Sequence, residues 1–329
     1  MKKLLQTLVF TLMALGMTLP ALAAQITLNS VVAHPPQHPV SVVYLEMLKS
    51  VQDRADKEIP GTLRINHRGG TEVIPQLEQA QAVRSGMVDM CMTAASYYVS
   101  AMPEMDTLAL SELTPTQERA TPLFAYLNEI HRKKLGVAYL ARLGSGMTFY
   151  LFTSKPFEKL EDLKNRRIRV SPTNIPLMKM LDIEPVNIPG PEIFTAVERG
   201  VVEGFVNPPS DLPDFGLTPM AKFVLVPPFY RPTNLVLMNA AKWDGLPDSV
   251  KKIFTEELIK AEGVIMERAM ASEKEVLEKV LAAGGKLVQL APAEATKFTD
   301  MANKALLDTT LAKSPEESQK IFDLSRKPK

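Results

Sequence analysis

The sequence contains a single cysteine and almost no net charge. Cys91 is the only cysteine among 329 residues, so the chain cannot form an internal disulfide. Its apolar neighbours Met90 and Met92 predict a buried thiol, with a reactive cysteine as the alternative. Lysine and arginine number 38 and aspartate and glutamate 37, and this balance gives no reason to expect a nucleic-acid partner.

The motifs of common enzyme classes are also missing. Residues 144–146, Gly-Ser-Gly, are not the nucleophile elbow of hydrolases, and residues 68–70, Arg-Gly-Gly, match no dinucleotide or phosphate-binding fingerprint. His34 and His38 have the spacing of a zinc-binding helix, but prolines at positions 35, 36 and 39 preclude a regular helix there. We therefore expect no metal and no cofactor. His34 ends a predicted strand and could contact a ligand; the alternative is an exposed loop histidine.

The only long apolar run lies at the N-terminus. Lys2 and Lys3 precede an uncharged, mostly apolar stretch over residues 4–18, Pro20 interrupts it, and residues 21–23, Ala-Leu-Ala, have the small-x-small pattern of a cleavage site. This pattern predicts a secretory signal peptide over residues 1–23, with a retained anchor helix as the alternative. No later segment is similar to a membrane span, so we expect a soluble, periplasmic mature chain without membrane insertion.

Beyond residue 23 the sequence alternates between strand-like and helix-like segments. The alternation predicts an α/β fold, with mixed sheets flanked by helices. Strands are predicted over residues 26–32, 63–66, 88–92, 137–143, 149–153, 165–170, 204–205 and 233–239, and helices over residues 40–57, 74–85, 116–135, 176–181, 192–199 and 248–283.

The length of the chain and its last predicted helix indicate two lobes. We expect lobe I to comprise residues 24–147 and about 235–275, and lobe II residues 148–234 and about 276–329. No flexible linker separates them, so crossover strands would form the hinge. The proline-free helix over residues 248–283 is long enough to span both lobes.

Arg169 is the most informative residue because it ends a predicted strand. In an open α/β sheet, the ends of strands face the crevice where ligands bind. The planar guanidinium matches a carboxylate in bidentate geometry. Arg167, two residues earlier, is predicted to be structural or solvent-facing near the start of the strand.

Five segments, in this order, resemble the solute-binding proteins of TRAP transporters, the DctP-like family of periplasmic receptors. They are residues 68–75 (RGGTEVIP), 78–89 (ending in VRSGMVD), 160–170 (LEDLKNRRIRV), 192–204 (EIFTAVERGVVEG) and 240–247 (AAKWDGLP). The resemblance covers the whole mature chain. It implies a binding protein rather than an enzyme, which closes two lobes around a carboxylate and delivers it to membrane permease subunits.

The resemblance also implies roles for single residues. Arg169 would pair with the ligand carboxylate; a surface or lobe–lobe ion pair is the alternative. Asn207 would line the cleft, or else stabilise a turn before Pro208. Further cleft candidates, taken from the matching loops, the end of the strand at residue 92 and the two crossovers, are Glu72, Thr93, Ala94, Tyr97, Phe149, Tyr150 and Tyr230.

Three departures from the family pattern indicate the ligand class. Phe149 and Tyr150 lie where some branches carry a second arginine, and Gly190 lies where some carry a bulky aromatic residue. These residues predict a widened, apolar pocket for a monocarboxylate with an apolar or aromatic body. Arg142 or Arg231 could still supply a second positive charge.

Three functions remain open at this stage. The first is a monomeric binding protein that serves a TRAP permease. The second is a binding protein of the same architecture that serves a sensor. The third is an exported enzyme that acts on organic acids, which turnover of a bound acid would reveal.

Overall fold

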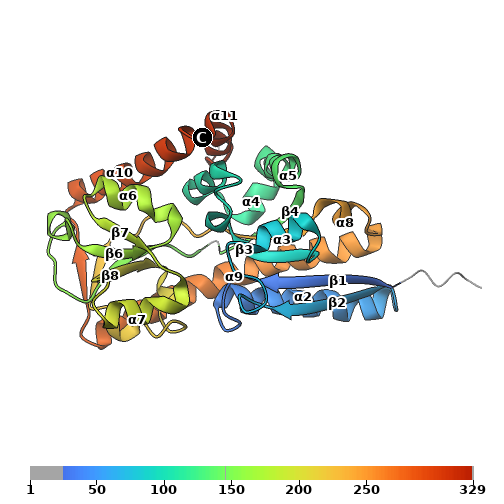
Figure 1. The fold of residues 1–329 in the computed structure, drawn as a ribbon, viewed down its shortest axis with the longest axis horizontal. Coiled ribbons are helices and arrows are strands. Elements are labelled where there is room, and N and C mark those ends of the chain that lie inside the picture. Colours follow the sequence, from blue (N-terminus) through green and yellow to red (C-terminus); the bar gives the residue numbers. More distant parts are fainter. Residues whose placement is uncertain (1–24, 145, 328–329) are drawn as a thin grey trace, which may run out of the picture.

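The computed structural model describes residues 25–144 and 146–327 as two lobes, each built around one mixed sheet (Figure 1). The predicted signal peptide, residues 1–23, lies outside the described residues. The predicted two-lobed α/β fold is confirmed. Within the described part of the chain, no helix combines the length and the apolar character needed to cross a membrane.

Lobe I is built on a five-stranded sheet in the order β2-β1-β3-β10-β4. Its strands are β1 (Ile26–Val32), β2 (Leu63–Gly69), β3 (Met90–Ala94), β4 (Val137–Leu143) and β10 (Asn234–Asn239). β1 runs parallel to β2 and β3, and β10 is antiparallel to β3 and β4. All residues of β3 and β4 are buried, including Cys91, as expected for strands covered on both faces.

Lobe II is built on a six-stranded sheet in the order β11-β9-β5-β8-β6-β7. Its strands are β5 (Tyr150–Thr153), β6 (Arg167–Val170), β7 (Glu184–Asn187), β8 (Gly204–Asn207), β9 (Phe223–Val226) and β11 (Lys286–Gln289). The parallel strands β8, β6 and β7 form one edge, so the carboxyl ends of these three strands lie together. Arg169 and Asn207 lie at these ends.

Helices cover both sheets. The α-helices are α2 (Pro39–Glu58), α3 (Gln79–Ser85), α4 (Pro115–Arg119), α5 (Pro122–Leu135), α6 (Ile175–Met180), α7 (Ile193–Glu198), α8 (Ala240–Asp244), α9 (Asp248–Ala282), α10 (Pro292–Leu311) and α11 (Pro315–Leu324). Short 3-10 helices are η1 (Ala95–Tyr97), η2 (Pro103–Leu110), η3 (Leu160–Leu163), η4 (Pro172–Asn174), η5 (Gly190–Glu192), η6 (Pro209–Asp211) and η7 (Thr218–Met220).

Two predicted helices are shorter than expected. The helix predicted over residues 74–85 begins only at Gln79, because the preceding residues form turns. The helix predicted over residues 116–135 is divided into α4 and α5. Thr114 caps α4 in a capping box with Gln117, and Pro122 then starts a new helix where it has no amide hydrogen to donate.

The long helix α9 belongs to both lobes. Its 35 residues extend for about 52 Å. Phe254 and Ile265 pack into the core of lobe I with α2 and β4, whereas Val276 and Val280 pack into a core of lobe II. The predicted spanning helix is therefore confirmed within one residue.

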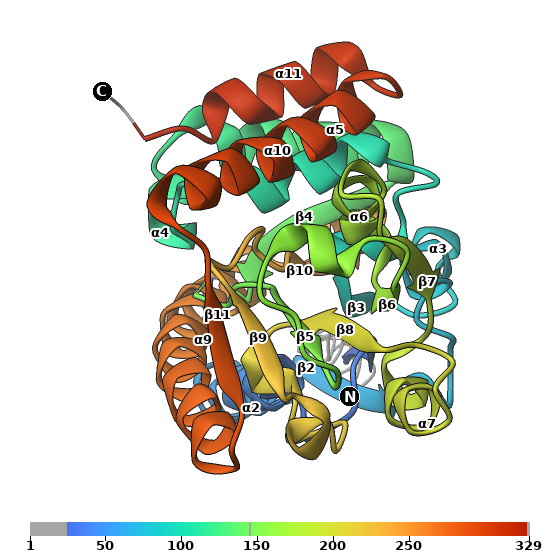
Figure 2. The same ribbon diagram turned by 90° about the vertical axis from the view of Figure 1, so that its left-hand side faces the viewer.

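The last helix differs from the expected division. α10 packs against α6 of lobe II, but α11 lies against η2 and α5, and its Ile321 belongs to a core cluster of lobe I (Figure 2). Assigning all residues after about 275 to lobe II was therefore wrong for α11. The other lobe boundaries stay a prediction.

Two crossover segments, one that includes Gly144 and residues 146–149 and one over residues 227–233, connect the lobes and pair with each other. Phe149 and Phe229 form an isolated antiparallel bridge with N–O distances of 3.1 and 2.9 Å. Gly144 has φ of 101°, and a Cβ there would lie 2.9 Å from the amide nitrogen of Asn234, so this crossing requires glycine. Glu273 of α9 accepts hydrogen bonds from Thr148, which joins the crossover to the helix.

Candidate functional site

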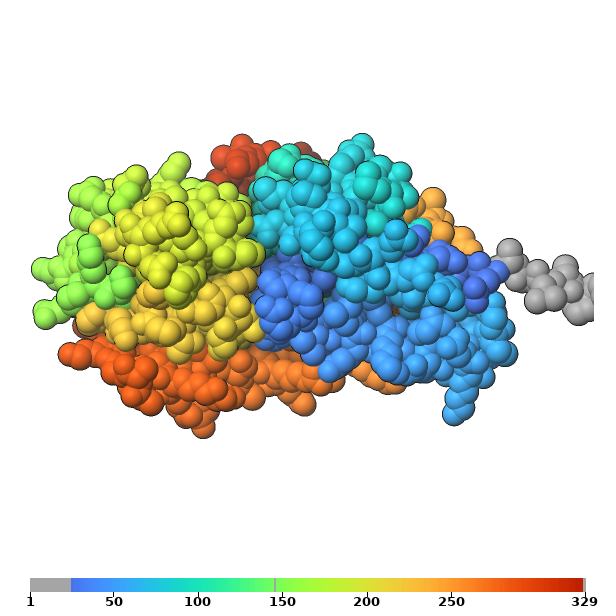
Figure 3. All heavy atoms as spheres, turned by 60° about the horizontal axis from the view of Figure 1, so that its bottom comes forward, coloured from blue at the N-terminus to red at the C-terminus, as the bar shows by residue number. Residues whose placement is uncertain are grey.

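A cavity of about 70 Å³, here called the inner cavity, lies between the lobes. This volume holds roughly five water-sized groups. Lobe I contributes His34, His38, Ala94, Ser96, Tyr97 and Asn234; lobe II contributes Arg169, Ser171, Thr173, Gly190, Asn207, Pro208, Asp211 and Phe215; the crossovers add Met147, Phe149, Arg231, Pro232 and Thr233. The two lobes meet along a closed seam, where the blue N-terminal region abuts the yellow-green surface of lobe II (Figure 3).

Arg169 lies in this cavity with only 6% of its surface exposed. Its Nε donates to the carbonyl oxygen of Ile188 at 2.8 Å, and its Nη1 donates to the side-chain oxygen of Asn207 at 2.9 Å and to Val206 at 3.4 Å. No described residue accepts a hydrogen bond from Nη2. Burial lowers the pKa of Arg169 to about 10, so the guanidinium remains charged at neutral pH. The Nε and Nη1 atoms of the guanidinium group are thus held in place by the protein, and Nη2 is available to an anion.

Arg167 is solvent-facing and does not line the cavity, as predicted for a residue near the start of the strand. It is exposed and donates to the carbonyl oxygen of Gly200 at 2.8 Å. The two arginines therefore share one strand and differ in burial, which makes Arg167 a matched control for Arg169.

Hydrogen bonds continue from Arg169 across the seam into lobe I. The amide nitrogen of Asn207 donates to Asp211 at 2.9 Å, and Nε2 of His38 pairs with the other oxygen of Asp211 at 3.0 Å. Nδ1 of His38 accepts the backbone N–H of Val40 at the start of α2, so Nε2 carries the proton that faces Asp211. Burial alone would raise the pKa of Asp211, but the charge and hydrogen bond of His38 and the bond from Asn207 together lower it. The carboxylate is therefore ionised and links the lobes.

His34 stacks on His38 with ring centroids 4.4 Å apart, and its Nε2 lies 2.8 Å from the side-chain oxygen of Asn234. Burial, reinforced by His38, lowers the pKa of His34 to about 4, so its ring is neutral. The two imidazoles face each other and are paired separately, rather than converging on one point. Among the residues that the structure describes, no group of three or more possible metal ligands is found.

Six predicted site residues line the inner cavity: Ala94, Tyr97, Phe149, Arg169, Gly190 and Asn207. Gly190 does not open the wall, contrary to expectation. A Cβ at Gly190 would lie 2.8 Å from the Phe215 ring, so that ring occupies the space that a larger side chain would need.

Four predicted site residues lie outside the inner cavity, which corrects their placement. Tyr150 alternates with Phe149 along the strand, so it points the other way and donates to Glu273 at 3.1 Å. Thr93 alternates with Ala94 in the same manner and is fully buried. Tyr230 donates to the carbonyl oxygen of Ala302, and Glu72 accepts the backbone N–H of Gly70 within its own turn.

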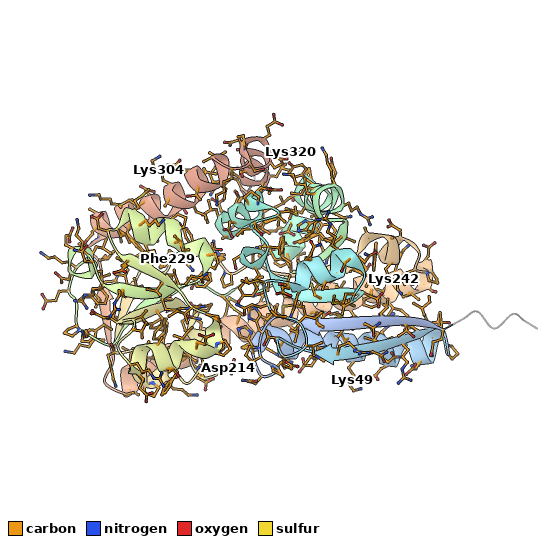
Figure 4. The ribbon with its side chains drawn as sticks, in the orientation of Figure 1. Lys49, Asp214, Phe229, Lys242, Lys304 and Lys320 are labelled. Atoms are coloured by element: carbon orange, nitrogen blue, oxygen red, sulfur yellow. The ribbon has the colours of Figure 1, made fainter. Side chains whose placement is uncertain are left out.

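Of the two candidates for a second cation, only Arg231 lines the inner cavity. Arg142, a residue of β4, is 1% exposed, pairs with Glu118 at 2.7 Å and does not line the cavity. Arg231 lines the cavity, is exposed, and donates to the carbonyl oxygen of Ser111 at 3.3 Å. The labelled lysines Lys49 and Lys304 lie on outer surfaces of the molecule (Figure 4).

Three cavity residues had no recognisable signal in the sequence. Asp211 follows Asn207 by four residues in a proline-rich turn, His38 suggested only a metal, and nothing in the sequence singled out Phe215. Asp214 lies near the same seam (Figure 4), and burial raises its pKa. The contact of His38 with Asp211 spans 173 positions, so no local pattern could have revealed it.

Comparison with known proteins gives consistent matches over most of the chain. Residues 34–313 match the family model described as bacterial extracellular solute-binding protein, family 7. The chain is 26% identical over 256 residues to a monocarboxylate 2-oxoacid-binding periplasmic protein of Nostoc, covering 73% of this chain and 68% of that protein. It is 22% identical over 274 residues to the C4-dicarboxylate-binding periplasmic protein DctP of Rhodobacter capsulatus, covering 78% and 79%.

The fold is similar to a solved structure of a Bordetella pertussis extracytoplasmic solute receptor that binds pyroglutamic acid. The TM-score is 0.79 with 18% identity, and the match covers 92% of this chain and all of that chain. At this identity the likeness concerns the fold.

Proposed function

Because the chain belongs to family 7 of the bacterial extracellular solute-binding proteins, the solute receptors of TRAP transporters, we propose that its inner cavity binds one small organic acid. The observation that carries the proposal is Arg169, a buried guanidinium fixed on one side and free on the other. Such a group needs an anion, because an unpaired buried charge is costly. The ligand carboxylate supplies that anion.

The charges of the cavity favour a monocarboxylate. Its lining includes the guanidinium groups of Arg169 and Arg231 and the carboxylate of Asp211, so two positive side chains face one negative side chain. One ligand carboxylate balances the remaining charge. The rings of Tyr97, Phe149 and Phe215 add apolar surface, which suits a ligand with an apolar or aromatic body. The Nostoc relative, named for binding monocarboxylate 2-oxoacids, supports the same class.

Binding is coupled to movement of the lobes about the paired crossovers. Hydrogen bonds on the cavity side that hold the lobes together include the pair of His38 with Asp211 and the bond that Thr173 donates to Asp106 at 2.7 Å. Opening at the crossovers separates these contacts and exposes Arg169. Ligand bound to Arg169 and to lobe I favours the closed form. The mature protein acts as a periplasmic monomer after removal of residues 1–23, and the closed form delivers the acid to the permease subunits.

A thermal-shift screen of small acids tests the proposal. A ligand at a hundred times its dissociation constant stabilises the native state by about 2.7 kcal/mol. We expect the largest shifts from 2-oxo and 2-hydroxy monocarboxylates with branched or aromatic bodies, and small shifts from succinate, malate and fumarate. Dominant C4-dicarboxylates would contradict the monocarboxylate assignment and indicate Arg231 as a second anion-binding group. Absence of any acid-dependent shift, together with no acid in native mass spectra, would contradict the binding function. Conversion of a bound acid to product would favour the enzyme alternative.

A further inference from the structure

A second cavity of about 390 Å³, here called the outer cavity, adjoins the inner one. The two share His34, Tyr97, Gly190 and Phe215, which form a neck between them. The outer cavity extends from this neck between the loop over residues 71–78 of lobe I and residues 189–192 of lobe II. A ligand longer than the inner cavity can therefore extend through this neck into the outer cavity.

The neck is uncharged and largely aromatic. His34 stacks on His38 on one side and lies 5.9 Å from the Tyr97 ring on the other. Opposite them, the Phe215 ring packs directly over the backbone of Gly190. Flat rings on several sides admit a methylene chain or an aryl group and offer nothing to neutralise a charge.

The outer cavity is lined mainly by apolar residues, and its charged lining residues are acidic. Its apolar residues include Pro35, Pro75, Leu77, Pro189 and Pro191. Its charged lining residues, within the described chain, are the exposed carboxylates Glu78 and Glu192. Leu77 is 57% exposed, although large apolar side chains are usually covered. An anionic group would be repelled here, whereas an apolar group would cover Leu77.

We propose that the outer cavity is a subsite for an uncharged, apolar tail of the ligand whose carboxylate is held by Arg169. The inner cavity accommodates the carboxylate and the adjacent carbons. Atoms further along the ligand pass between Phe215 and His34 and contact Leu77 and the prolines. This inference rests on the proposed function and specifies its ligand as a monocarboxylate with an extended apolar tail.

Calorimetric titration of the mature protein with a straight-chain series tests the subsite: 2-oxobutanoate, 2-oxohexanoate and 2-oxooctanoate. Each methylene that enters the outer cavity should raise affinity about threefold to fourfold. The variant Leu77→Ser should weaken 2-oxooctanoate severalfold and leave 2-oxobutanoate unchanged. Leu281→Ser is the matched control, because Leu281 is also exposed, at 41%, and lies at the end of α9 in lobe II.

The possible outcomes separate this inference from the proposed function. Equal affinities along the series, or equal losses for long and short acids in Leu77→Ser, would overturn the tail subsite while leaving acid binding intact. A 1,8-dicarboxylate that binds as tightly as 2-oxooctanoate would also overturn it, because Glu78 and Glu192 should repel the second carboxylate. Failure of every acid in the series to bind would instead count against the proposed function.

Discussion

Replacement of Arg169 by alanine should remove most of the ligand affinity while preserving the fold. The substitution leaves the carbonyl oxygens of Ile188 and Val206 and the side-chain oxygen of Asn207 without their shared donor, and it leaves the ligand carboxylate unpaired. Breaking a buried ion pair from one side costs about 3–5 kcal/mol, which corresponds to a loss of about 150-fold to 5,000-fold in affinity. Arg169→Lys should recover only part of this loss, because an ammonium group cannot form the planar fork.

The control for this experiment lies on the same strand. Arg167→Ala removes an exposed arginine with one backbone contact, so its effect on affinity should stay within about 0.5 kcal/mol. Calorimetric titration with the best acid from the screen measures the affinities, and circular dichroism verifies that each variant is folded. If Arg169→Ala binds within threefold of the wild type, the carboxylate lies elsewhere in the cleft. Equal losses in both variants would indicate a general effect of strand β6 rather than a contact with the ligand.

Three further substitutions examine the seam and the neck. His38→Ala removes a hydrogen bond to the buried carboxylate of Asp211 that exists only in the closed form, so ligand affinity should fall about 10-fold to 150-fold. Small-angle scattering should show a larger radius of gyration for this variant than for the wild type at equal ligand concentration. An unchanged radius and affinity would contradict a role of this hydrogen bond in closure. Gly190→Ala places a Cβ 2.8 Å from the Phe215 ring and should weaken the longest acids most, whereas a uniform loss for all acids would argue against a neck at this position. Burial lowers the pKa of His34 to about 4, so closure of the lobes favours the neutral ring. Ligand affinity should therefore be highest above pH 6.5 and should fall by up to tenfold per pH unit as the pH decreases towards 4. In titrations between pH 7 and 5, His34→Asn should flatten this pH dependence.

The sequence predicted those features that have local causes. The helix over residues 248–283 has no proline and spaces its apolar residues for burial along its length, and α9 ends within one residue of that prediction. Arg169 was identified because strand ends of an α/β sheet face the crevice, and the cavity lies there. The division at Pro122 could also have been read locally, because proline at a helix start follows from its missing amide hydrogen.

The other features of the site depend on contacts between segments that are distant in the sequence, so they could not be predicted from local patterns. Gly190 suggested an open wall, but Phe215, 25 positions later, fills the space. Asp211 had no distinguishing neighbours and gained its role only when the lobes brought His38 against it. Strand alternation could have separated Phe149 from Tyr150, because one faces the cleft and the other faces α9, but the direction of each depends on where the sheet lies.

The shared helix α9 has a consequence for how the protein folds and for how it can be dissected. Neither lobe is continuous in the chain, and the core of each contains side chains from the same helix: Phe254 and Ile265 in one, Val276 and Val280 in the other. An isolated lobe would expose the apolar side chains that α9 packs into the other lobe, so we expect that neither lobe is an autonomous folding unit. Calorimetry should accordingly record one cooperative heat-absorption peak for both lobes, unlike the independent transitions of domains joined by a flexible linker. For protein engineering, exchange of a single lobe between relatives would have to include the part of α9 that packs against it.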